Sequence, residues 1–408
     1  MKLLCKSLVL LAVSVFAVVS VFGGGFQLNE HGARAMAQAG AFAARAYDGS
    51  ATYFNPAGFG FQDRGSVYLG GTLIMPTTSF YGPLQLNTNE KTKMASQTFT
   101  PINATISYPI SNGLVAAIAV NNPFGLGTEW PDSWVGRYII QKVDLQTWFI
   151  TPTIAYKLTD QLSVGIGLNY VLGNVKLKKA VSIPLDAPSP EANLDLDGHA
   201  FGFNAGLLYK VSPEISIGVS YRHKVKLDAS GNASFAPNYP GLSLPQGDVK
   251  STLTLPATGF AGIAYKPMAN LEIEADYQFI GWSSYNELRF DFAADGSTTV
   301  SPKNYQDTYI IRVGSEYSID PWHLRAGYLY DNSPVKIEYS EPLLPDANRN
   351  GFNVGLGYDI TPDWSVDAAY FFLLFQDRQA QNTIPDISFD GTYHSYVNLV
   401  GVNLEFKF

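Results

Sequence analysis

Tyr156-Lys-Leu-Thr-Asp-Gln-Leu162 is one copy of a repeated arrangement that decides the fold. A tyrosine ends one run of residues, a short polar turn follows, and a large apolar residue opens the next run. The other copies lie at 209–215, 265–271 and 358–364, with looser ones at 108–114 and 317–322. Short polar segments between alternating runs indicate hairpin turns, so the repeat predicts a series of antiparallel strand pairs.

The residues after each turn alternate in polarity. After Leu162 the apolar positions are Val164, Ile166, Leu168 and Tyr170, and the positions between them are Ser163, Gly165, Gly167 and Asn169. The same alternation follows Ile215 and Trp364. Successive side chains of a strand point to opposite faces, so each strand has one apolar face and one small or polar face.

Aromatic residues gather at the same end of every hairpin, which a soluble barrel or sandwich does not require. A transmembrane barrel turns its apolar face to lipid, places aromatic girdles at the interfaces, and has short turns on one side and long loops on the other. The tight turns recur about every 40 to 56 residues, more than two spanning strands of about 10 residues need. The excess predicts long loops at 76–95, 123–136, 182–197, 230–248, 292–304, 331–350 and 376–391.

These turns and loops predict an all-β fold, a closed transmembrane β-barrel of about 14 antiparallel strands over residues 62–408. Closure is required because an open sheet edge in hydrocarbon leaves amides unpaired. Charged residues make up 15% of the chain, against roughly 25% in a soluble domain. We therefore expect a multi-pass protein of the bacterial outer membrane, a monomer in contact with outer-membrane lipid and lipopolysaccharide.

Residues 1–24 have the pattern of a signal peptide. Lys2 and Lys6 precede an apolar run from Leu8 to Phe22, and glycines follow it. The run is shorter than the about 20 residues of a membrane-spanning helix, so cleavage near Gly23 or Gly24 is favoured over an uncleaved anchor. The one cysteine, Cys5, lies in this leader, which leaves the mature chain without a disulfide or a thiolate site.

Several function classes are disfavoured by what the sequence lacks. The net charge of −8 and the lack of a basic stripe argue against a nucleic-acid partner. The five histidines are scattered singly, without metal-ligand spacing, and no Gly-x-Ser-x-Gly motif is present. We expect neither an enzyme nor a bound metal or cofactor.

Residues 25–61 differ from the strands that follow. Asn29 is a candidate N-cap, and Ala33, Met36, Ala37, Gly40, Ala41 and Ala44 recur at helical spacing. Asn55-Pro56-Ala57-Gly58 then forms a turn. An element this small cannot fold alone, so we expect a hatch that plugs the barrel lumen rather than a periplasmic tail.

Three carboxylates of one predicted strand are candidates to anchor this hatch. Glu272, Glu274 and Asp276 alternate with apolar residues and face the lumen together. We hypothesise that they hold Arg34 or Arg45 of the hatch. The alternative is that they are solvated residues of a polar lumen.

The chain ends in an alternating strand that closes on Phe408. This end resembles the C-terminal strand by which outer-membrane proteins are recognised by the barrel-assembly machinery. Taken alone, it could equally be the last strand of a soluble sheet.

Several motifs together resemble the outer-membrane long-chain fatty acid transport proteins, a family that includes the toluene and xylene porins. The motifs span most of the mature chain. They are Gly25-Phe-Gln-Leu-Asn-Glu30, Gly32-Ala-Arg-Ala35, Asp48-Gly-Ser-Ala-Thr-Tyr-Phe-Asn-Pro-Ala-Gly58, Pro123-Phe-Gly-Leu-Gly-Thr-Glu-Trp130, Trp134-Val-Gly-Arg-Tyr138 and Asp331-Asn-Ser-Pro334.

The resemblance implies an apolar pocket inside a plugged barrel, and a kinked third strand that opens the wall sideways. By resemblance, Phe26, Gln27 and Leu28 form a movable ligand gate. The third strand would run from about Gly113 to Asn122, with the lateral opening at Val115, Ala116, Ala117, Ile118 and Ala119. Small residues and the ladder-breaking Pro123 are compatible with such a gap, and equally with a short strand that runs into a loop.

One departure from the family bears on the ligand. Fatty-acid-binding members carry a lysine before the Asp-x-Tyr that opens the tenth strand, where this chain has Gln306. Gln306 is therefore a candidate polar contact in the pocket, which favours neutral hydrocarbons or a mixed range. We expect uptake of hydrophobic small molecules, either fatty acids or hydrocarbons, with a general diffusion porin as the alternative and an adhesin or structural barrel as a third.

Overall fold

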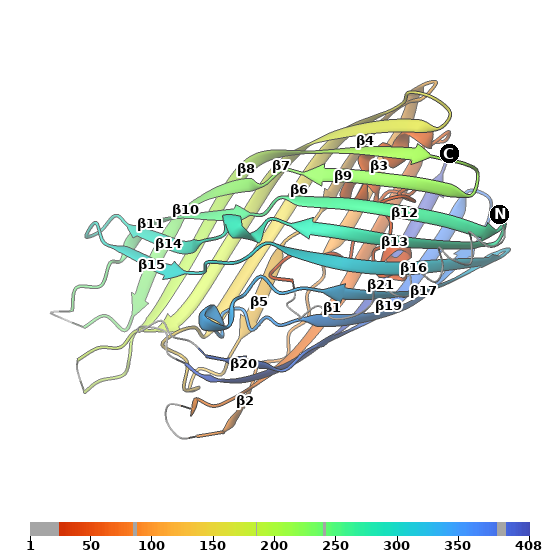
Figure 1. Cartoon of the computed structure of the whole chain (residues 1–408). Helices are drawn as coiled ribbons and strands as arrows, with labels where there is room; N and C mark the ends of the chain where they lie inside the picture. The colour runs from red at the N-terminus through yellow and green to blue at the C-terminus, as the bar shows by residue number, and fades with distance from the viewer. Residues whose placement is uncertain (1–23, 85–87, 185, 240–241, 382–388) are drawn as a thin grey trace.

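The computed structural model describes residues 24–84, 88–184, 186–239, 242–381 and 389–408. It has the predicted fold, a closed antiparallel barrel of 14 strands (Figure 1). Some barrel strands are divided by short breaks, so the strand segments are more numerous. The segments are β1 (Ser66–Tyr81), β2 (Lys91–Lys93), β3 (Ile102–Ser111), β4 (Leu114–Asn121), β5 (Gly125–Glu129), β6 (Lys142–Lys157), β7 (Leu162–Ala180), β8 (Glu191–Lys210), β9 (Ile215–Arg222), β10 (Val225–Ala236), β11 (Gly247–Leu255), β12 (Thr258–Met268), β13 (Leu271–Ile280), β14 (Glu287–Phe292), β15 (Thr298–Pro302), β16 (Thr308–Ile319), β17 (Trp322–Asp331), β18 (Arg349–Asp359), β19 (Trp364–Phe375), β20 (Arg378–Ala380) and β21 (Gly391–Lys407).

The wall closes because the first and last strands pair. β1 and β21 are antiparallel neighbours from Ser66↔Lys407 to Tyr81↔Thr392. The backbone amides of Gly65 and Phe408 each donate to the carbonyl of the other residue at 2.9 Å. Closure pairs the backbone groups that the two end strands would otherwise leave free.

The outer face is apolar and the inner face is small or polar, as the alternation predicts. Ile166 and Leu168 of β7 are 55% and 63% exposed, whereas Ser163 and Asn169 are buried inside the barrel. The tight turns lie where they were predicted, between the strands at one end of the barrel. That end has a ring of outward aromatic residues, which are Tyr108, Tyr156, Tyr209, Tyr265, Tyr317, Trp322 and Trp364.

The opposite end differs from the prediction, because many residues assigned to loops are strands. β1 continues to Tyr81, β8 begins at Glu191, β10 runs to Ala236, and β15 lies inside the predicted 292–304 loop. β10, β11, β14 and β15 form the far end of the barrel in Figure 1. Their outward side chains are polar because they lie beyond the apolar band, and polar alternation in this region resembles loop composition.

The described helices are short and precede the barrel or interrupt its wall. They are α2 (Ala33–Met36), α3 (Ala51–Phe54), η1 (Pro56–Phe61), η3 (Trp282–Ser284) and η4 (Ile337–Tyr339). No helix among the described residues is long and apolar enough to cross a membrane. The predicted signal peptide lies outside the described residues, apart from Gly24.

The segment forms a short helix, but the predicted N-cap at Asn29 was wrong. The N-cap of α2 is Gly32, and the helix ends at Met36 because the backbone turns left-handed at Ala39 and Gly40, with φ of 60° and 73°. The amides that follow donate to side chains of the barrel wall instead of to a helix. Local spacing favoured a helix here, and contacts with the wall override it.

Candidate functional site

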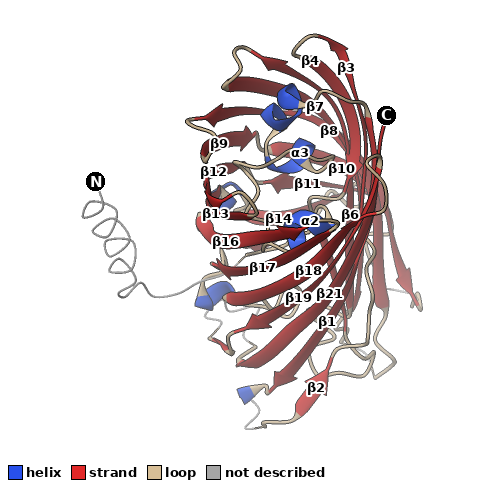
Figure 2. Cartoon of the chain, turned by 90° about the vertical axis from the view of Figure 1, so that its right-hand side faces the viewer, coloured by secondary structure: helices blue, strands red, loops and turns tan. Residues whose placement is uncertain are grey.

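Residues 24–61 lie inside the barrel. Figure 2 shows α2 and α3 within the ring of strands. α2 packs against β18, β19 and β21, and η1 packs against β6, β7 and β8. The lumen-facing glycines make room for this segment: a Cβ at Gly165 would lie 2.4 Å from the carbonyl carbon of Pro56, and one at Gly218 would lie 1.9 Å from the carbonyl oxygen of Ala43.

Arg45 and the carboxylates of β13 join the N-terminal segment to the wall. Arg45 Nε lies 2.8 Å from Glu274 Oε2, and the Arg45 guanidinium lies 3.4 Å from Glu272. Asp276 Oδ2 accepts the amides of Phe42 and Ala43 at 2.9 and 3.0 Å, and Glu274 also accepts the amide of Ala44 at 2.6 Å. The structure therefore brings all three predicted carboxylates to the N-terminal segment, and Arg45 to two of them.

Arg34 pairs with a different carboxylate from those predicted. Its guanidinium lies 2.9 Å from Glu316 of β16, which also accepts a 2.6 Å hydrogen bond from Arg325. Glu316 was not singled out from the sequence, because the partner of Arg34 depends on which strand faces α2 in the closed barrel.

The predicted hatch turn fastens the N-terminal segment to itself and to the wall. Asn55 Nδ2 donates to the carbonyl oxygens of Ala43 and Leu207 at 2.8 and 3.0 Å, and Asn55 Oδ1 accepts the amide of Ala57 at 3.1 Å. Pro56 lies in the first turn of η1, where its missing N–H costs no hydrogen bond. Ala57 and Gly58 are buried beneath it.

The three predicted gate residues run antiparallel to the segment after β4. The amide of Leu28 donates to Pro123 at 2.8 Å, and the amide of Gly125 donates to Phe26 at 3.0 Å. Gln27 Nε2 donates to the Tyr53 hydroxyl at 3.0 Å. The gate segment therefore contacts both the wall and helix α3.

Phe26 lies among aromatic residues of the wall. Its ring centroid is 4.6 Å from that of Trp282, 5.6 Å from Tyr285 and 6.2 Å from Phe124, all in edge-on contacts. The preceding amide, of Gly25, donates to Asp346 Oδ2 at 2.9 Å. Desolvation by burial raises the pKa of Asp346 from its ordinary value to about 6.

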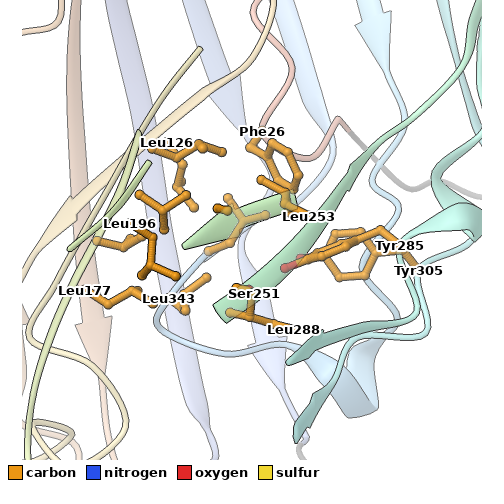
Figure 3. A pocket seen from close by; sticks show the side chains of 15 residues that line it. Phe26, Leu126, Leu177, Leu196, Ser251, Leu253, Tyr285, Leu288, Tyr305 and Leu343 are labelled. Carbon is orange, nitrogen blue, oxygen red and sulfur yellow. The ribbon is translucent and has the colours of Figure 1, made fainter. Parts of the chain in front are cut away.

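A narrow apolar pocket of about 40 Å³ lies beside Phe26. Leucines from several strands line it, with Tyr285 and Tyr305 on one side and Leu343 from the 332–348 connection (Figure 3). Tyr285 lies between β13 and β14, and Tyr305 lies between β15 and β16. Among the described residues that line it, Ser251 and the two tyrosines supply the polar side chains, and none is charged.

The wall has a gap after β4. The register changes by one residue, from Asn121↔Phe149 to Gly125↔Gln146, so the chain bulges between these positions. Side chains replace the ladder there: Asn122 Nδ2 donates to the Thr147 carbonyl at 2.7 Å, and Asn122 Oδ1 accepts the Ile102 amide at 2.9 Å. On the N-terminal side of Ile102, Phe99 pairs with Ile74 of β1. The chain meets β5 again at Ala95, whose amide donates to the Glu129 carbonyl at 2.8 Å, so the gap lies between these points.

The gap therefore lies after Val115–Ala119 in the chain, and these residues themselves are part of an intact strand. Residues Val115 to Ala119 lie in β4, the third barrel strand, and pair continuously with β3 and β6. Val115, Ala117 and Ala119 face the lumen, and Ile118 is 45% exposed on the outer face. Small residues there give space to the N-terminal segment, while the wall is broken further along the chain.

A cavity of about 480 Å³ lies at the gap. Phe26, Gln27 and Leu28 line it on the inside, and Phe99 and Gly127 lie on the two sides of the gap. Its lining also includes Gln146 and Trp148, which face outward on β6. The cavity shares Phe26, Leu126, Leu145 and Leu344 with the apolar pocket, so Phe26 lies between the pocket and the gap.

Gln306 directly follows Tyr305, which lines the apolar pocket. The amide of Gln306 donates to the Pro334 carbonyl at 3.0 Å, and Gln306 lines neither the apolar pocket nor the gap cavity. The nearby buried polar residue is Lys303, which is ion-paired with Glu341 and donates to Ser301 at 3.0 Å. The polar contact predicted at Gln306 stays a prediction.

Sequence reasoning missed Trp282, Tyr285, Tyr305 and Asp346. The first three lie in breaks of the strand pattern, where apolar aromatics interrupt the alternation instead of following it. Such buried aromatics in a strand break are a usable signal for a binding site. Asp346 carried no signal, because its role depends on contact with Gly25, 321 residues earlier.

Known proteins are similar to this chain over most of its length. Residues 14–408 match the family described as outer membrane protein transport protein (OMPP1/FadL/TodX). A long-chain fatty acid transport protein of Salmonella typhi is 26% identical over 401 residues, which cover 91% of this chain and 92% of that protein. The 47 kDa outer membrane protein of Pasteurella multocida is 27% identical over 434 residues, covering 98% of each.

Solved structures share the fold. A FadL homologue of Pseudomonas aeruginosa superposes with a TM-score of 0.85 at 21% identity, covering 94% of this chain and all of that one. The toluene transporter TbuX of Ralstonia pickettii superposes with a TM-score of 0.72 at 19% identity, covering 93% and 99%. With the family match over nearly the whole chain, this protein belongs to the OMPP1/FadL/TodX family of outer-membrane transport proteins.

Proposed function

We propose that this protein takes up hydrophobic compounds across the outer membrane, either long-chain fatty acids or aromatic and aliphatic hydrocarbons. The observation that carries the proposal is the apolar pocket that meets a gap in the barrel wall at Phe26. The relatives are named for fatty acid and toluene transport, which supports the same class of cargo.

The ligand leaves the pocket sideways through the gap between the 98–102 segment and β5. An apolar solute gains about 25 cal/mol per Å² by staying out of water, so a route from an apolar pocket into lipid avoids rehydration. Trp148 on the outer wall marks the mouth of this route. Passage toward the periplasm past the N-terminal segment is the other exit.

Residues 25–61 act as the hatch, and Phe26, Gln27 and Leu28 act as its gate. The hydrogen bond between Gln27 and Tyr53 links the gate to α3, so movement of one strains the other. The alternative from the sequence was a general diffusion porin. A porin needs an open lumen, and residues 25–61 occupy the lumen here. Planar-bilayer recording checks the point, because a hatched barrel passes no large steady ion current.

Blocking the gap tests the lateral exit. A Cβ at Gly127 would lie 2.0 Å from the Phe99 ring, so Gly127→Leu forces bulk into the gap. We expect ligand uptake by cells carrying Gly127→Leu to fall about 10-fold or more, because the blocked geometry removes the dry route. Gly259→Leu is the matched control, since its Cβ lies 3.8 Å from the nearest atom, Ser220 O, and its strand neighbours β9 and β13 do not border the gap. Normal uptake by Gly127→Leu would contradict the lateral exit and would leave passage toward the periplasm as the remaining route.

The leader at 1–24 directs secretion, lipopolysaccharide surrounds the outer half of the monomeric barrel, and the barrel-assembly machinery recognises the strand that ends at Phe408. Phe408 is 49% exposed and its ring lies 6.1 Å from that of Tyr108, which leaves it available on the outer surface. Phe408→Ala should reduce the amount of folded protein in the outer membrane, whereas Lys407→Ala should not.

A further inference from the structure

Two tyrosine hydroxyls in the lining of the pocket beside Phe26, and the indole N–H of the neighbouring Trp282, have no hydrogen-bond partner among the described residues. Trp282 Nε1 is fully buried and unpaired. Tyr285 and Tyr305 are 5% and 4% exposed, and among the described residues their hydroxyls have no hydrogen-bond partner. Tyrosine hydroxyls inside a protein usually find a partner, so the Tyr285 and Tyr305 hydroxyls are placed for one that the protein does not supply.

The three donors lie together. The Tyr285 and Tyr305 ring centroids are 5.1 Å apart and nearly perpendicular, and the Trp282 and Tyr305 centroids are 5.9 Å apart. Figure 3 shows both tyrosine side chains extending toward the leucines of the pocket from one side. A ligand held among the leucines would therefore present its polar end to phenol groups.

Two cations beside the pocket, Lys303 and Arg349, are ion-paired. Lys303 is two residues from Tyr305, and its side chain is 1% exposed and ion-paired with Glu341. The backbone of Glu341 forms an isolated β-bridge with Leu344, which lines the pocket. Arg349, which lines the adjoining gap cavity, pairs with Asp331 at 2.7 Å.

Further out on β7, Lys176 and Lys178 are ion-paired, and Lys179 is not among the residues that line the pocket. Lys176 pairs with Asp195 at 3.5 Å and Lys178 with Glu191 at 3.0 Å, both toward solvent beyond the apolar band. Because no charged residue is among the described residues that line the pocket, a carboxylate entering it would lose its hydration without an adjacent cation, and burying an unpaired charge is strongly unfavourable.

We infer that the pocket selects uncharged ligands that carry one hydrogen-bonding oxygen, such as long-chain alcohols, ketones or phenols, over the corresponding carboxylates. This inference rests on the proposed uptake function and narrows its ligand class. Tyr285 and Tyr305 are the specificity-determining residues, and Glu341 enforces neutrality by holding the Lys303 ammonium.

Equilibrium dialysis of the detergent-folded protein against labelled decane, 1-decanol and decanoate near neutral pH tests the inference. Decanoate is ionised there, because carboxyl groups ionise near pH 4 to 5. We expect the wild type to bind 1-decanol about 10-fold or more tightly than decanoate, because only the carboxylate must be desolvated unpaired. Equal or tighter binding of decanoate would overturn the inference, whereas binding of none of the three would overturn the uptake function itself.

Variants separate the hydrogen bonds from the charge. Tyr285→Phe and Tyr305→Phe should each lower the preference for 1-decanol over decane roughly 2- to 10-fold, the usual weight of one hydrogen bond. Tyr328→Phe is the control, because its hydroxyl donates to Asn350 on the outer wall. An unchanged preference in both pocket variants would remove the tyrosines from the inference.

Glu341→Gln should free the Lys303 ammonium and strengthen decanoate binding relative to 1-decanol. The double variant Lys303→Met with Glu341→Gln removes both charges and should discriminate as the wild type does. Asp291→Asn, which breaks an exposed ion pair with Arg289, serves as the control for a general charge effect. If Glu341→Gln and the double variant behave alike, the ammonium does not set the preference.

Discussion

The amide of Gly25 donates a 2.9 Å hydrogen bond to Asp346, so the connection between β17 and β18 holds the start of the gate segment. Asp346 Oδ2 also accepts the Ser333 hydroxyl at 2.6 Å, within the Asp331-Asn-Ser-Pro334 motif. The carboxylate is buried, so protonation of Asp346 is coupled to whether the gate segment is seated against it.

The seating of the gate should depend on pH around 6. Desolvation raises the pKa of Asp346 to about 6, above its ordinary 3.8, so the seated structure binds a proton more tightly than an opened, hydrated one. Lowering the pH through 6 therefore favours the seated gate, and raising it disfavours it. Maleimide labelling of a Leu28→Cys variant, corrected for the thiolate fraction, should slow from about pH 7.5 to about pH 5. Asp346→Asn should abolish this dependence, and a rate that rises on acidification would contradict it.

Loss of the Arg45 guanidinium should loosen the hatch. Arg45→Met leaves Glu274, which is completely buried, without its cation, and breaking a buried pair costs about 3 to 5 kcal/mol. We expect residues 25–61 to become sensitive to thermolysin in the detergent-folded barrel. Arg289→Met, which breaks a solvent-exposed pair, should leave the digestion pattern unchanged. Equal resistance in both variants would show that the pair does not hold the hatch.

A side chain at Gly218 should displace the hatch from the lumen. Its Cβ would lie 1.9 Å from the Ala43 carbonyl oxygen, so Gly218→Val is incompatible with the packed segment, while the outer wall need not change. Planar bilayers containing Gly218→Val should show ion currents that the wild type lacks. Gly259→Ala is the control, because its nearest contact is 3.8 Å away. A silent Gly218→Val barrel would mean that the segment adapts without leaving.

The Tyr53 hydroxyl should restrain the gate. It accepts from Gln27 and donates at 3.2 Å to the Leu28 carbonyl or at 3.0 Å to Asn29. Tyr53→Phe leaves the buried Gln27 amide unpaired, a loss of about 1 to 3 kcal/mol. Labelling of Leu28→Cys should therefore become about 5-fold faster or more. Tyr370→Phe, whose hydroxyl donates to Asn398 on the outer wall, should not alter the rate.

The architecture followed from local patterns. The alternation after Leu162 required only that neighbouring side chains point to opposite faces, and the exposed Ile166 and Leu168 confirm which face meets lipid. The length of the strands did not follow, because outward polar residues beyond the apolar band, as in β10 and β15, have the composition of loops.

The contacts inside the lumen were less accessible to sequence reasoning. The carboxylates of β13 were recognisable because they share one face of one strand, and the structure brings Arg45 to two of them. The pairing of Arg34 with Glu316, 282 residues later, was not recognisable, because every strand presents small or polar groups to the lumen.

The sequence by itself determined that the chain forms a barrel with an apolar exterior, since period-two polarity, tight turns and the need to pair every amide in hydrocarbon act through near neighbours. Only the tertiary structure decided where the wall opens and what surrounds Phe26. A one-residue change of register beside Asn122 and the meeting of Phe26 with Trp282 and Tyr285 depend on how distant strands align when the sheet closes, which no local pattern specifies.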